Sequence, residues 1–478
     1  MIKKIEKIQE NTNIVFLCPK GSDLKPLQLT ENENTYVEGC IRGKETFVEI
    51  NRYRQWLFIQ FYEKNADKSR LLENLRKAGS KLHSSLCAIK IEKIVLSSAD
   101  EDSSLILAYT EGLALSNYQF LKYVKVKKEK QFSLKEIGLF ASSLANEQIS
   151  RLNSVIDAVY RTRDMVNEPV SFLDAAQLSK EIAEMGKASG FKVEVLEKRK
   201  IESLKMGGLL AVNRGSVDPP TFTIMEWNPG KAINKKPIVL VGKGIVFDTG
   251  GLSLKPTSDS MDYMKSDMSG AAAVAATIYA VAKEKLPLHL VGLVPATDNR
   301  PGNNAYTPGD IITMYDGTTV EMLNADAEGR MILADALAYA AHYEPELIIE
   351  LSTLTGAALM AVGPGATVGM GTASSGVFEK LIESGDNVGE RIVQFPFWDE
   401  YEESLKSDIA DIKNIGARYA GAITAGKFLA HFTKFPFVHL DIAGPAWTKE
   451  TQDYKSKGGT GVGVRLLFDF FSKKVAGK

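Results

Sequence analysis

The sequence predicts a two-domain α/β protein. A smaller N-terminal α/β domain with its linker helix, residues 1–165, precedes a larger C-terminal α/β domain, residues 166–478, with a mixed sheet flanked by helices. The length of 478 residues exceeds what one ordinary core accommodates. Strand-like and helical patterns alternate in both parts, which is typical of helices packed on a sheet. Between the parts, Asn167-Glu168-Pro169 ends a helical pattern that runs from Ser133 to Met165, because proline and its restricted predecessor stop a helix.

The N-terminal part predicts a compact α/β unit without a cluster of catalytic residue types. Its helical patterns include Lys68–Leu86. Its strand-like runs are Asn13–Leu17, Trp56–Phe61, Lys93–Leu96 and Leu105–Ala108. The basic run Lys122–Lys130 indicates a solvated strand or linker. A nucleic-acid patch is the minor alternative there, since no organised aromatic platform flanks the run.

The C-terminal part alternates strands and helices, which predicts substantial parallel pairing with helices on both faces of the sheet. The expected strands are Pro237–Val241, Leu288–Val294, Glu346–Leu351 and Phe437–Ile442, with a hairpin at Ile311–Leu323. The expected helices are Ser269–Lys285 and Gly329–His342. In such folds ligands gather beyond the carboxyl ends of the strands, and the polar motifs described below follow predicted strands.

Composition excludes several classes of protein. A net charge of -1 suggests neither nucleic acid nor an anionic membrane as an obligate partner. The three cysteines form no CxxC pair, which fits a reducing cytosol and argues against disulfides or a zinc–thiolate site. The N-terminus lacks a hydrophobic signal region, and the longest mainly apolar run, Ala271–Ala282, is too short to cross a bilayer. The sequence therefore predicts a soluble, cytoplasmic protein without a membrane partner.

Common hydrolase and nucleotide-binding motifs are also missing. The chain has five histidines and contains no HExxH, GxSxG or GxxxxGK[ST] pattern. Any catalytic metal would therefore need carboxylate ligands.

The stretch Asn324–Leu337, NADAEGRMILADAL, places Asp326, Glu328 and Arg330 at alternate positions before an apolar run. In an extended segment these three side chains would face one pocket. The alternative is an ordinary helix start, with Asp326 as N-cap and Glu328 in the first turn. Taken alone, the stretch favours the helix start.

A second polar cluster reverses that preference. The segment Val241–Lys255, VGKGIVFDTGGLSLK, embeds Lys243, Asp248 and Lys255 among glycines and apolar residues. Asp267 precedes the Ala-rich helix, where an N-cap is its own alternative role. A dense carboxylate cluster cannot stay ionised in a small pocket without cations, and two divalent metals sharing carboxylates would resolve this.

These segments, together with LSTLTGA at Leu351–Ala357 and HLDIAGPAW at His439–Trp447, resemble the leucine (cytosol) aminopeptidase family. Matching order and spacing extend from Arg163 to Arg465, and NADAEGR is the most specific of the motifs. The resemblance implies a two-metal exopeptidase in the C-terminal domain. Near the linker, EGLALSNYQF at Glu111–Phe120 is also similar to the family.

The resemblance implies a metal-binding role for five residues. Asp248 and Glu328 would bridge the two metals. Asp326 would complete one site through its carboxylate and main-chain carbonyl, and Lys243 and Asp267 would complete the other.

It also implies the catalytic and substrate-binding residues. Lys255 would polarise the scissile carbonyl and stabilise the oxyanion. Arg330 would hold a bicarbonate that serves as general base. The backbone that lines the substrate cleft would come from Thr353, Leu354 and Gly356.

Two positions depart from the family pattern. Ala325 replaces the usual threonine, which we expect to be tolerated if only the flanking groups bind metal. One extra residue lies between Lys255 and Asp267, within Thr257–Tyr263, and leaves the path of that loop open.

Two further features have ordinary structural interpretations. His439 beside Asp441 suggests a catalytic dyad, but a core histidine on a buried strand is favoured. The glycine-rich Gly363–Gly371 indicates a flexible cleft edge, because no GxGxxG follows a strand there.

We therefore expect a metal-dependent aminopeptidase with leucine-type preference, acting on peptides with a free N-terminus. The resemblance implies two divalent cations per subunit, Mn²⁺ or Zn²⁺, and a homohexamer. The alternatives are a cysteinylglycine-type dipeptidase, a family member that also binds DNA as a regulator, and a metal-free scaffold.

Overall fold

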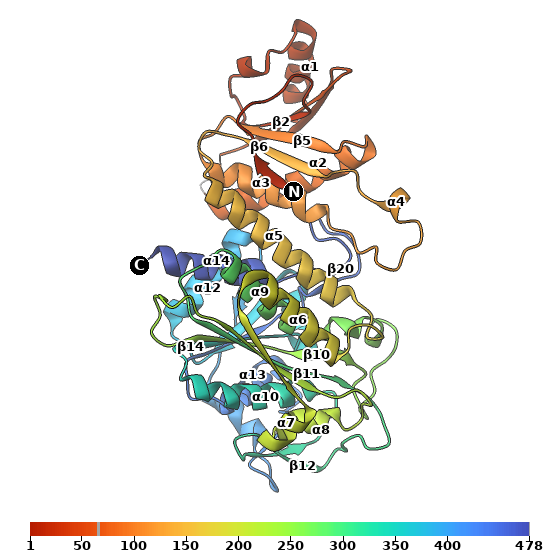
Figure 1. Cartoon of the computed structure of the whole chain (residues 1–478), viewed down its shortest axis with the longest axis vertical. Helices are drawn as coiled ribbons and strands as arrows, with labels where there is room; N and C mark the ends of the chain where they lie inside the picture. The colour runs from red at the N-terminus through yellow and green to blue at the C-terminus, as the bar shows by residue number, and fades with distance from the viewer. Residues whose placement is uncertain (65–66, 478) are drawn as a thin grey trace. The chain divides into compact units, whose positions relative to one another are not determined.

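The computed structural model describes residues 1–64 and 67–477, without the side chains of residues 127 and 128. Contacts divide the chain into two compact units (Figure 1). The first comprises Met1–Ile156, Asn387–Gly389 and Thr451–Ser456, and the second comprises Asp157–Asp386, Glu390–Glu450 and Lys457–Lys478. The boundary falls inside helix α5 (Asn146–Asn167). Among the described helices, none combines the length and hydrophobicity that crossing a membrane requires.

The first unit is built on a six-stranded sheet in the order β1-β6-β5-β2-β4-β3. Its strands are β1 (Ile2–Lys4), β2 (Ile14–Pro19), β3 (Phe47–Asn51), β4 (Trp56–Tyr62), β5 (Lys93–Ser98) and β6 (Glu136–Phe140). Its helices are α1 (Glu31–Arg42), α2 (Lys68–Ala88), α3 (Ser103–Ser116) and the short α4 (Lys127–Lys130). All pairs are parallel except β3 with β4, so the unit is the compact α/β body that the sequence predicts.

Three local predictions in this unit are wrong. Leu105–Ala108 lies in helix α3, whose N-terminus is capped by Asp102 and which is apolar nearly all round because it is buried. Ser133–Met165 is not one helix, since strand β6 precedes α5. For the basic run Lys122–Lys130, the strand alternative is wrong, because the run forms turns and helix α4, which fit the linker alternative. The end of α5 at Asn167, before Pro169, is as predicted.

The second unit contains a nine-stranded mixed sheet in the order β16-β15-β18-β14-β9-β11-β8-β7, with β10 paired to β11. Its strands are β7 (Lys192–Glu197), β8 (Thr221–Trp227), β9 (Ile238–Gly242), β10 (Gly244–Asp248), β11 (Leu290–Asn299), β14 (Leu347–Ser352), β15 (Thr367–Gly371), β16 (Ile392–Gln394) and β18 (Phe437–Asp441). The central strands β18, β14, β9 and β11 are parallel, so their carboxyl ends share one edge. Strand β15 is mostly buried, so the flexible edge expected at Gly363–Gly371 is wrong for Thr367–Gly371, while Gly363–Gly365 forms a separate turn with no buried residue.

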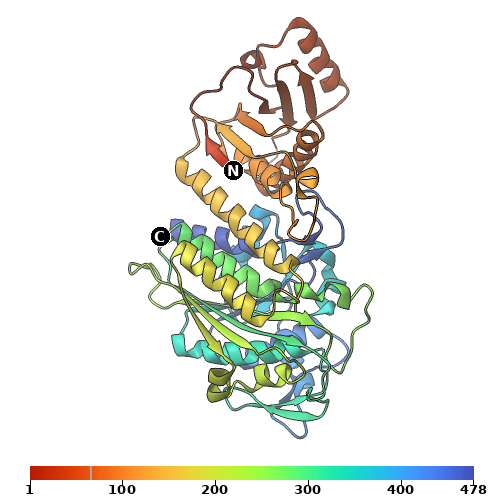
Figure 2. The same cartoon turned by 45° about the vertical axis from the view of Figure 1, so that its right-hand side comes forward.

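Helices cover both faces of this sheet, which confirms the predicted class (Figures 1 and 2). Helix α9 (Ser269–Lys283) packs against β9 and β14, and α10 (Glu328–Ala340) packs against β9 and β11 on the opposite face of the sheet. The remaining helices are α6 (Ala175–Ser189), α7 (Lys198–Leu204), α8 (Gly207–Asn213), α9 (Ser269–Lys283), α10 (Glu328–Ala340), α11 (Gly356–Val362), α12 (Ser375–Val388), α13 (Gly421–His431) and α14 (Val464–Ala476). The predicted hairpin is formed by β12 (Asp310–Thr313) and β13 (Thr319–Met322), with β17 (Ile412–Lys413) beside it, and a further short pair is β19 (Trp447–Thr448) with β20 (Gly458–Gly459).

Candidate active site

Polar residues converge where the parallel strands of the second unit end. Lys243 directly follows β9, Asp248 ends β10, Asn299 ends β11 and Thr353 directly follows β14. Asp326 and Glu328 approach the same edge from the turn that opens α10. Strand ends separated by about a hundred residues thus supply one cluster; Lys243 donates to the Thr353 carbonyl at 3.2 Å across 110 residues. This is the placement expected for a ligand site in an open α/β sheet.

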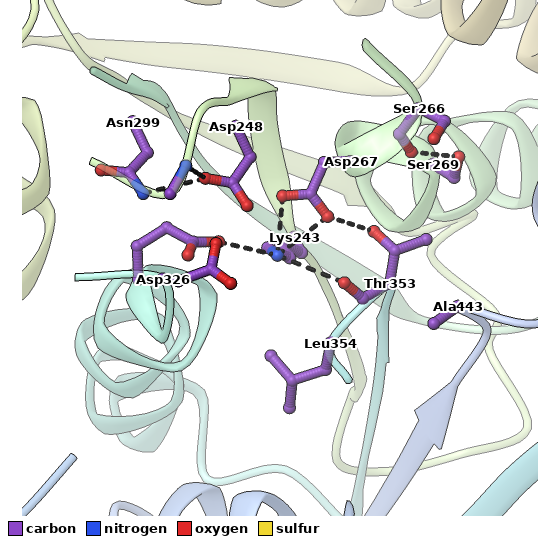
Figure 3. Close-up of polar contacts among 12 residues, drawn as sticks. Lys243, Asp248, Ser266, Asp267, Ser269, Asn299, Asp326, Thr353, Leu354 and Ala443 are labelled. Carbon is purple, nitrogen blue, oxygen red and sulfur yellow. Dashed lines mark hydrogen bonds and ion pairs between the residues drawn. The ribbon is translucent and has the colours of Figure 1, made fainter. Parts of the chain in front are cut away.

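Lys243 lies at the centre of the cluster and is 3% exposed (Figure 3). Its Nζ is 2.8 Å from Asp267 Oδ2 and 2.9 Å from Glu328 Oε1. The side chain passes directly over Gly329, where a Cβ would lie 2.3 Å from the lysine Cε. The absence of a side chain at Gly329 therefore allows this lysine to reach both carboxylates.

Lys255 bridges the other two carboxylates. Its Nζ lies 3.0 Å from Asp248 Oδ2 and 2.5 Å from Asp326 Oδ1. It is more exposed than Lys243, with side-chain exposures of 15% and 3% respectively. Lys255 is thus the amine that a ligand entering from solvent can reach.

The carboxylates of Asp248, Asp326 and Glu328 offer ligand atoms that all lie within 4.8 Å of one another. Four carboxylates, Asp267 included, face two ammonium groups, so negative charge is in excess if all are ionised. Glu328 Oε2 is buried and has no hydrogen-bond partner among the residues that the structure describes. An oxygen-rich, electronegative and buried donor set of this kind fits divalent cations.

The titration of the cluster reflects the same crowding. Burial, reinforced by Glu328, raises the pKa of Asp267 to about 7 despite the opposing charge of Lys243. Burial also raises the pKa of Asp248 and of Asp326. Burial disfavours the charged form of Lys243, but the carboxylates of Asp267 and Glu328 outweigh it and raise its pKa. Without metal, the two lysines hold the carboxylates together as ammonium ions.

Arg330 is also buried, yet it does not join the carboxylates. Its Nη1 donates to the Asn414 carbonyl at 2.8 Å, and its guanidinium lies 6.0 Å from the centre of the Phe428 ring. Its Nε has no hydrogen-bond partner in the described part of the chain. Burial lowers the pKa of Arg330 to about 10. A buried guanidinium with a free donor fits a small planar anion.

The predicted cleft residues differ in their contacts. Thr353 Oγ1 donates to Asp267 Oδ1 at 2.7 Å, and the Leu354 N–H donates to Asp441 Oδ1 at 3.1 Å. Gly356 opens helix α11, is exposed, and has open space where a side chain would be. Thr353 therefore meets the cluster directly, and Gly356 does not.

Of the two sequence-based accounts of Asp326, Glu328 and Arg330, the extended segment is wrong, whereas the helix start with Glu328 in the first turn is confirmed except for its N-cap. The segment is not extended, because Glu328 already lies in α10, and Arg330 is in its first turn. Asp326 is not the N-cap either, since that position is Ala327. Asp267 likewise does not cap α9, whose N-cap is Met268. The helix start nevertheless brings Asp326 and Glu328 together.

Other details of the predicted site can be placed. His439 lies buried on β18, and its Nδ1 is 2.5 Å from Glu350 Oε2, so it pairs with Glu350 and not with Asp441. Ala325 is fully buried, and its carbonyl accepts hydrogen bonds from Asn299 and Tyr306.

The loop Thr257–Tyr263, which carries the extra residue, forms an ion pair with the rest of the unit between Asp259 and Lys449.

Sequence reasoning missed two asparagines that hold the site together. Asn299 Nδ2 donates to Asp248 Oδ1, and Asn414 Nδ2 donates to the Asn324 carbonyl, both at 2.9 Å. Asn299 had a readable signal, since it follows a buried strand as the motif DNRPG. Asn414 had none, because it lies in a segment without a recognisable pattern.

Comparison with known proteins decides the family. A profile of the cytosol aminopeptidase family, catalytic domain, matches residues 160–468. This chain belongs to the cytosol aminopeptidase family. It is therefore an aminopeptidase, a hydrolase of the leucyl aminopeptidase type, as the sequence motifs predict.

Relatives and solved structures agree with this assignment. A probable cytosol aminopeptidase of Chlorobium limicola is 43% identical over 424 residues, covering 84% of this chain and 83% of the relative. One from Chlorobaculum tepidum is 48% identical over 388 residues, covering 78% and 76%. The bottromycin maturation enzyme BotP in complex with Mn superposes with a TM-score of 0.85 at 27% identity, covering 97% of this chain and 100% of that chain. A mutant of tomato leucine aminopeptidase gives 0.86 at 25% identity, covering 99% and 96%.

Proposed function

We propose that this aminopeptidase releases N-terminal residues, with a leucine-type preference, through two divalent cations bound at the strand-end cluster. The observation that carries the proposal is the excess of largely buried carboxylates, among which Glu328 Oε2 has no hydrogen-bond partner in the described residues. Asp248 and Glu328 would be shared between the cations. Asp326 would complete one site, and Lys243 and Asp267 the other.

The cations, when bound, would supply the Lewis acidity that activates water and recognises the free amine of the substrate. Mn²⁺ suits a carboxylate-rich set, and BotP is a relative described in complex with Mn. Zn²⁺ is the other candidate. Lys243 can act as a ligand only as a neutral amine, so its proton must leave when a cation enters.

The remaining roles fall to residues beside the cluster. Lys255, whose side chain is 15% exposed, keeps its proton, because burial disfavours its charge but Asp248 and Glu328 outweigh this and raise its pKa. Its ammonium would meet the negative charge that develops on the scissile carbonyl. Arg330 would hold bicarbonate through its free Nε, and the bicarbonate would accept the proton of the attacking water. Backbone groups of Thr353, Leu354 and Gly356 would orient the peptide.

We further infer a cytoplasmic homohexamer acting on peptides with a free N-terminus, by similarity to the family. The three cysteines are all free thiols, which fits a reducing compartment. No observation in the structure favours a dipeptidase or a DNA-binding role over peptide hydrolysis.

The test is metal analysis of the purified protein alongside hydrolysis of leucine amide. Exhaustive chelation should abolish hydrolysis, and adding Mn²⁺ or Zn²⁺ should restore it at a stoichiometry of two cations per chain. Full activity in protein shown to be metal-free would overturn the proposal. A chelated protein that keeps its circular dichroism spectrum is the control for loss of fold.

A further inference from the structure

Asn299 occupies an unusual place between the two turns that carry the clustered carboxylates. It ends β11, is fully buried, and is the register partner of Asp248 on β10. Its Nδ2 donates to Asp248 Oδ1 at 2.9 Å (Figure 3). The same Nδ2 donates to the Ala325 carbonyl, also at 2.9 Å. One amide group therefore joins the turn after β10 to the turn before α10.

The two hydrogen-bond partners determine which end of the Asn299 amide faces them. A carboxylate oxygen and a backbone carbonyl can only accept, so the NH₂ side of the amide must face both. The Asn299 backbone adds to the link, since its carbonyl accepts from Thr249 N–H at 3.0 Å and from Thr249 Oγ1 at 2.8 Å. Asn299 is thus fastened to the first turn by its backbone and to both turns by its side chain.

The contact orients the Asp248 carboxylate. Asp248 Oδ1 accepts from Asn299 Nδ2 and from the Gly250 N–H at 2.8 Å, so this oxygen is committed to the protein. Asp248 Oδ2 is left facing Lys255 and the other carboxylates. Ala325 immediately precedes Asp326. The hydrogen bond from Asn299 to the Ala325 carbonyl therefore fixes the backbone position from which the Asp326 and Glu328 side chains project.

The other half of the Asn299 amide makes no comparable contact. Its Oδ1 is buried and finds no hydrogen-bond partner within residues 1–64 and 67–477. A buried amide with an unsatisfied oxygen is a poor choice for stability alone. The two donors of the amide are therefore the reason for asparagine at this position.

We propose that Asn299 is a positioning residue that sets the spacing between Asp248 and the Asp326–Glu328 pair, and thereby the affinity of the site for divalent cations. The inference rests on the proposed two-metal function. Groups that orient metal ligands typically change affinity by about 10–100-fold when removed.

The test compares three variants by Mn²⁺ titration of the folded protein. Asn299→Ala removes both donors, and Asn299→Asp keeps the shape but sets a carboxylate against two acceptors. Asn213→Ala is the matched control, because Asn213 is a buried asparagine whose Nδ2 donates to the Asp218 carbonyl and to Thr297 Oγ1, neither of which is a proposed metal ligand. Thermal midpoints without metal measure the structural cost of each change.

Both Asn299 variants should bind Mn²⁺ about 10–100-fold more weakly, with Asn299→Asp the weaker binder. The hydrolysis rate that the Asn299 variants lose should be partly restored as the Mn²⁺ concentration is raised. Asn213→Ala should keep the wild-type affinity for Mn²⁺ even if its thermal midpoint falls as far as those of the Asn299 variants. If Asn299→Ala does not fold, Asn299→Ser replaces it, since the shorter hydroxyl cannot reach both acceptors and the same loss is expected.

The outcomes separate the two proposals. A wild-type protein that binds neither Mn²⁺ nor Zn²⁺ would overturn the proposed metal function and, with it, the role of Asn299. A wild-type protein that binds two cations, with an Asn299 variant of equal affinity, would overturn only the role of Asn299.

Discussion

Lys243 Nζ lies 2.9 Å from Glu328 Oε1, and the two side chains are 3% and 2% exposed. This buried ion pair connects the end of β9 to the first turn of α10. Lys243 also contacts Asp267, so a single ammonium ion pairs with two of the proposed metal ligands. Lys255 does the same for Asp248 and Asp326. Each lysine thus contacts two carboxylates. The proposed mechanism nevertheless requires Lys243 to be a neutral amine and Lys255 to remain a protonated ammonium.

The first prediction separates these two lysines by substitution with arginine. Arginine keeps a positive charge but cannot offer a lone pair to a metal. Lys243→Arg should therefore lose one cation and nearly all activity, whereas Lys255→Arg should keep both cations and part of the rate. Metal stoichiometry measured beside kinetics checks this.

Lys255→Ala completes the comparison. It should keep both cations and lose on the order of 10²–10³ in kcat, as is typical for removing one oxyanion donor. Normal metal affinity in Lys243→Arg would remove Lys243 from the ligand set.

The second prediction concerns the free amine of the substrate. If one cation binds that amine, an N-acetylated peptide should be a very poor substrate while the same peptide with a free N-terminus is hydrolysed. Initial rates on the matched pair provide the measurement. Comparable rates would identify an amidase or endopeptidase site instead.

The third prediction addresses the proposed anion at Arg330. In buffer depleted of carbon dioxide, the wild-type rate should rise and saturate as bicarbonate is added. Arg330→Ala should lose this response and about 10²-fold or more in rate, the usual range for losing a general base. Arg300→Ala is the control, because Arg300 is paired with Asp298 and should leave the bicarbonate response intact. A bicarbonate response that survives in Arg330→Ala would place the anion elsewhere.

The fourth prediction uses Asp335, a fully buried carboxyl on α10 that accepts from the Leu209 and Tyr315 N–H groups, both at 2.9 Å. Burial raises the pKa of Asp335 to about 7. In the unfolded chain the carboxyl titrates near about 3.9, so between the two values the folded state binds the extra proton. The stabilising contribution is present at low pH and is lost as the pH rises through about 7.

Asp335→Asn removes this titration. The wild-type free energy of unfolding, relative to that of the variant, should therefore fall by about 1–2 kcal/mol between about pH 5.5 and about pH 8. At the acidic end the variant should be the less stable protein, because its amide can accept only one of the two N–H bonds. Unfolding curves of both proteins at the two pH values test the prediction. A constant difference would show that Asp335 does not titrate in this range.

Local pattern was sufficient for much of the second unit. The expected strand at Pro237–Val241 and helix at Ser269–Lys285 correspond to β9 and α9 with small shifts at the ends. Buried strands and an Ala-rich helix have strong signals, because burial demands continuous apolar runs. The strand predicted at Leu105–Ala108 was wrong for the same reason. Helix α3 is buried on nearly all sides and has no polar face, so its apolar run resembles that of a buried strand.

What the sequence by itself determined is the inventory of the site: its carboxylates, its two lysines, its arginine, and the strand ends and helix start that carry them. Those features are local, since side-chain chemistry and backbone pattern are readable within a few residues. Only the tertiary structure decided which of these groups meet. Lys243 reaches Glu328 because Gly329 leaves room for it, and Asn299 reaches Asp248 because β10 and β11 are neighbours in the sheet. Strand order is set by packing between segments far apart in the chain, and no local pattern records it.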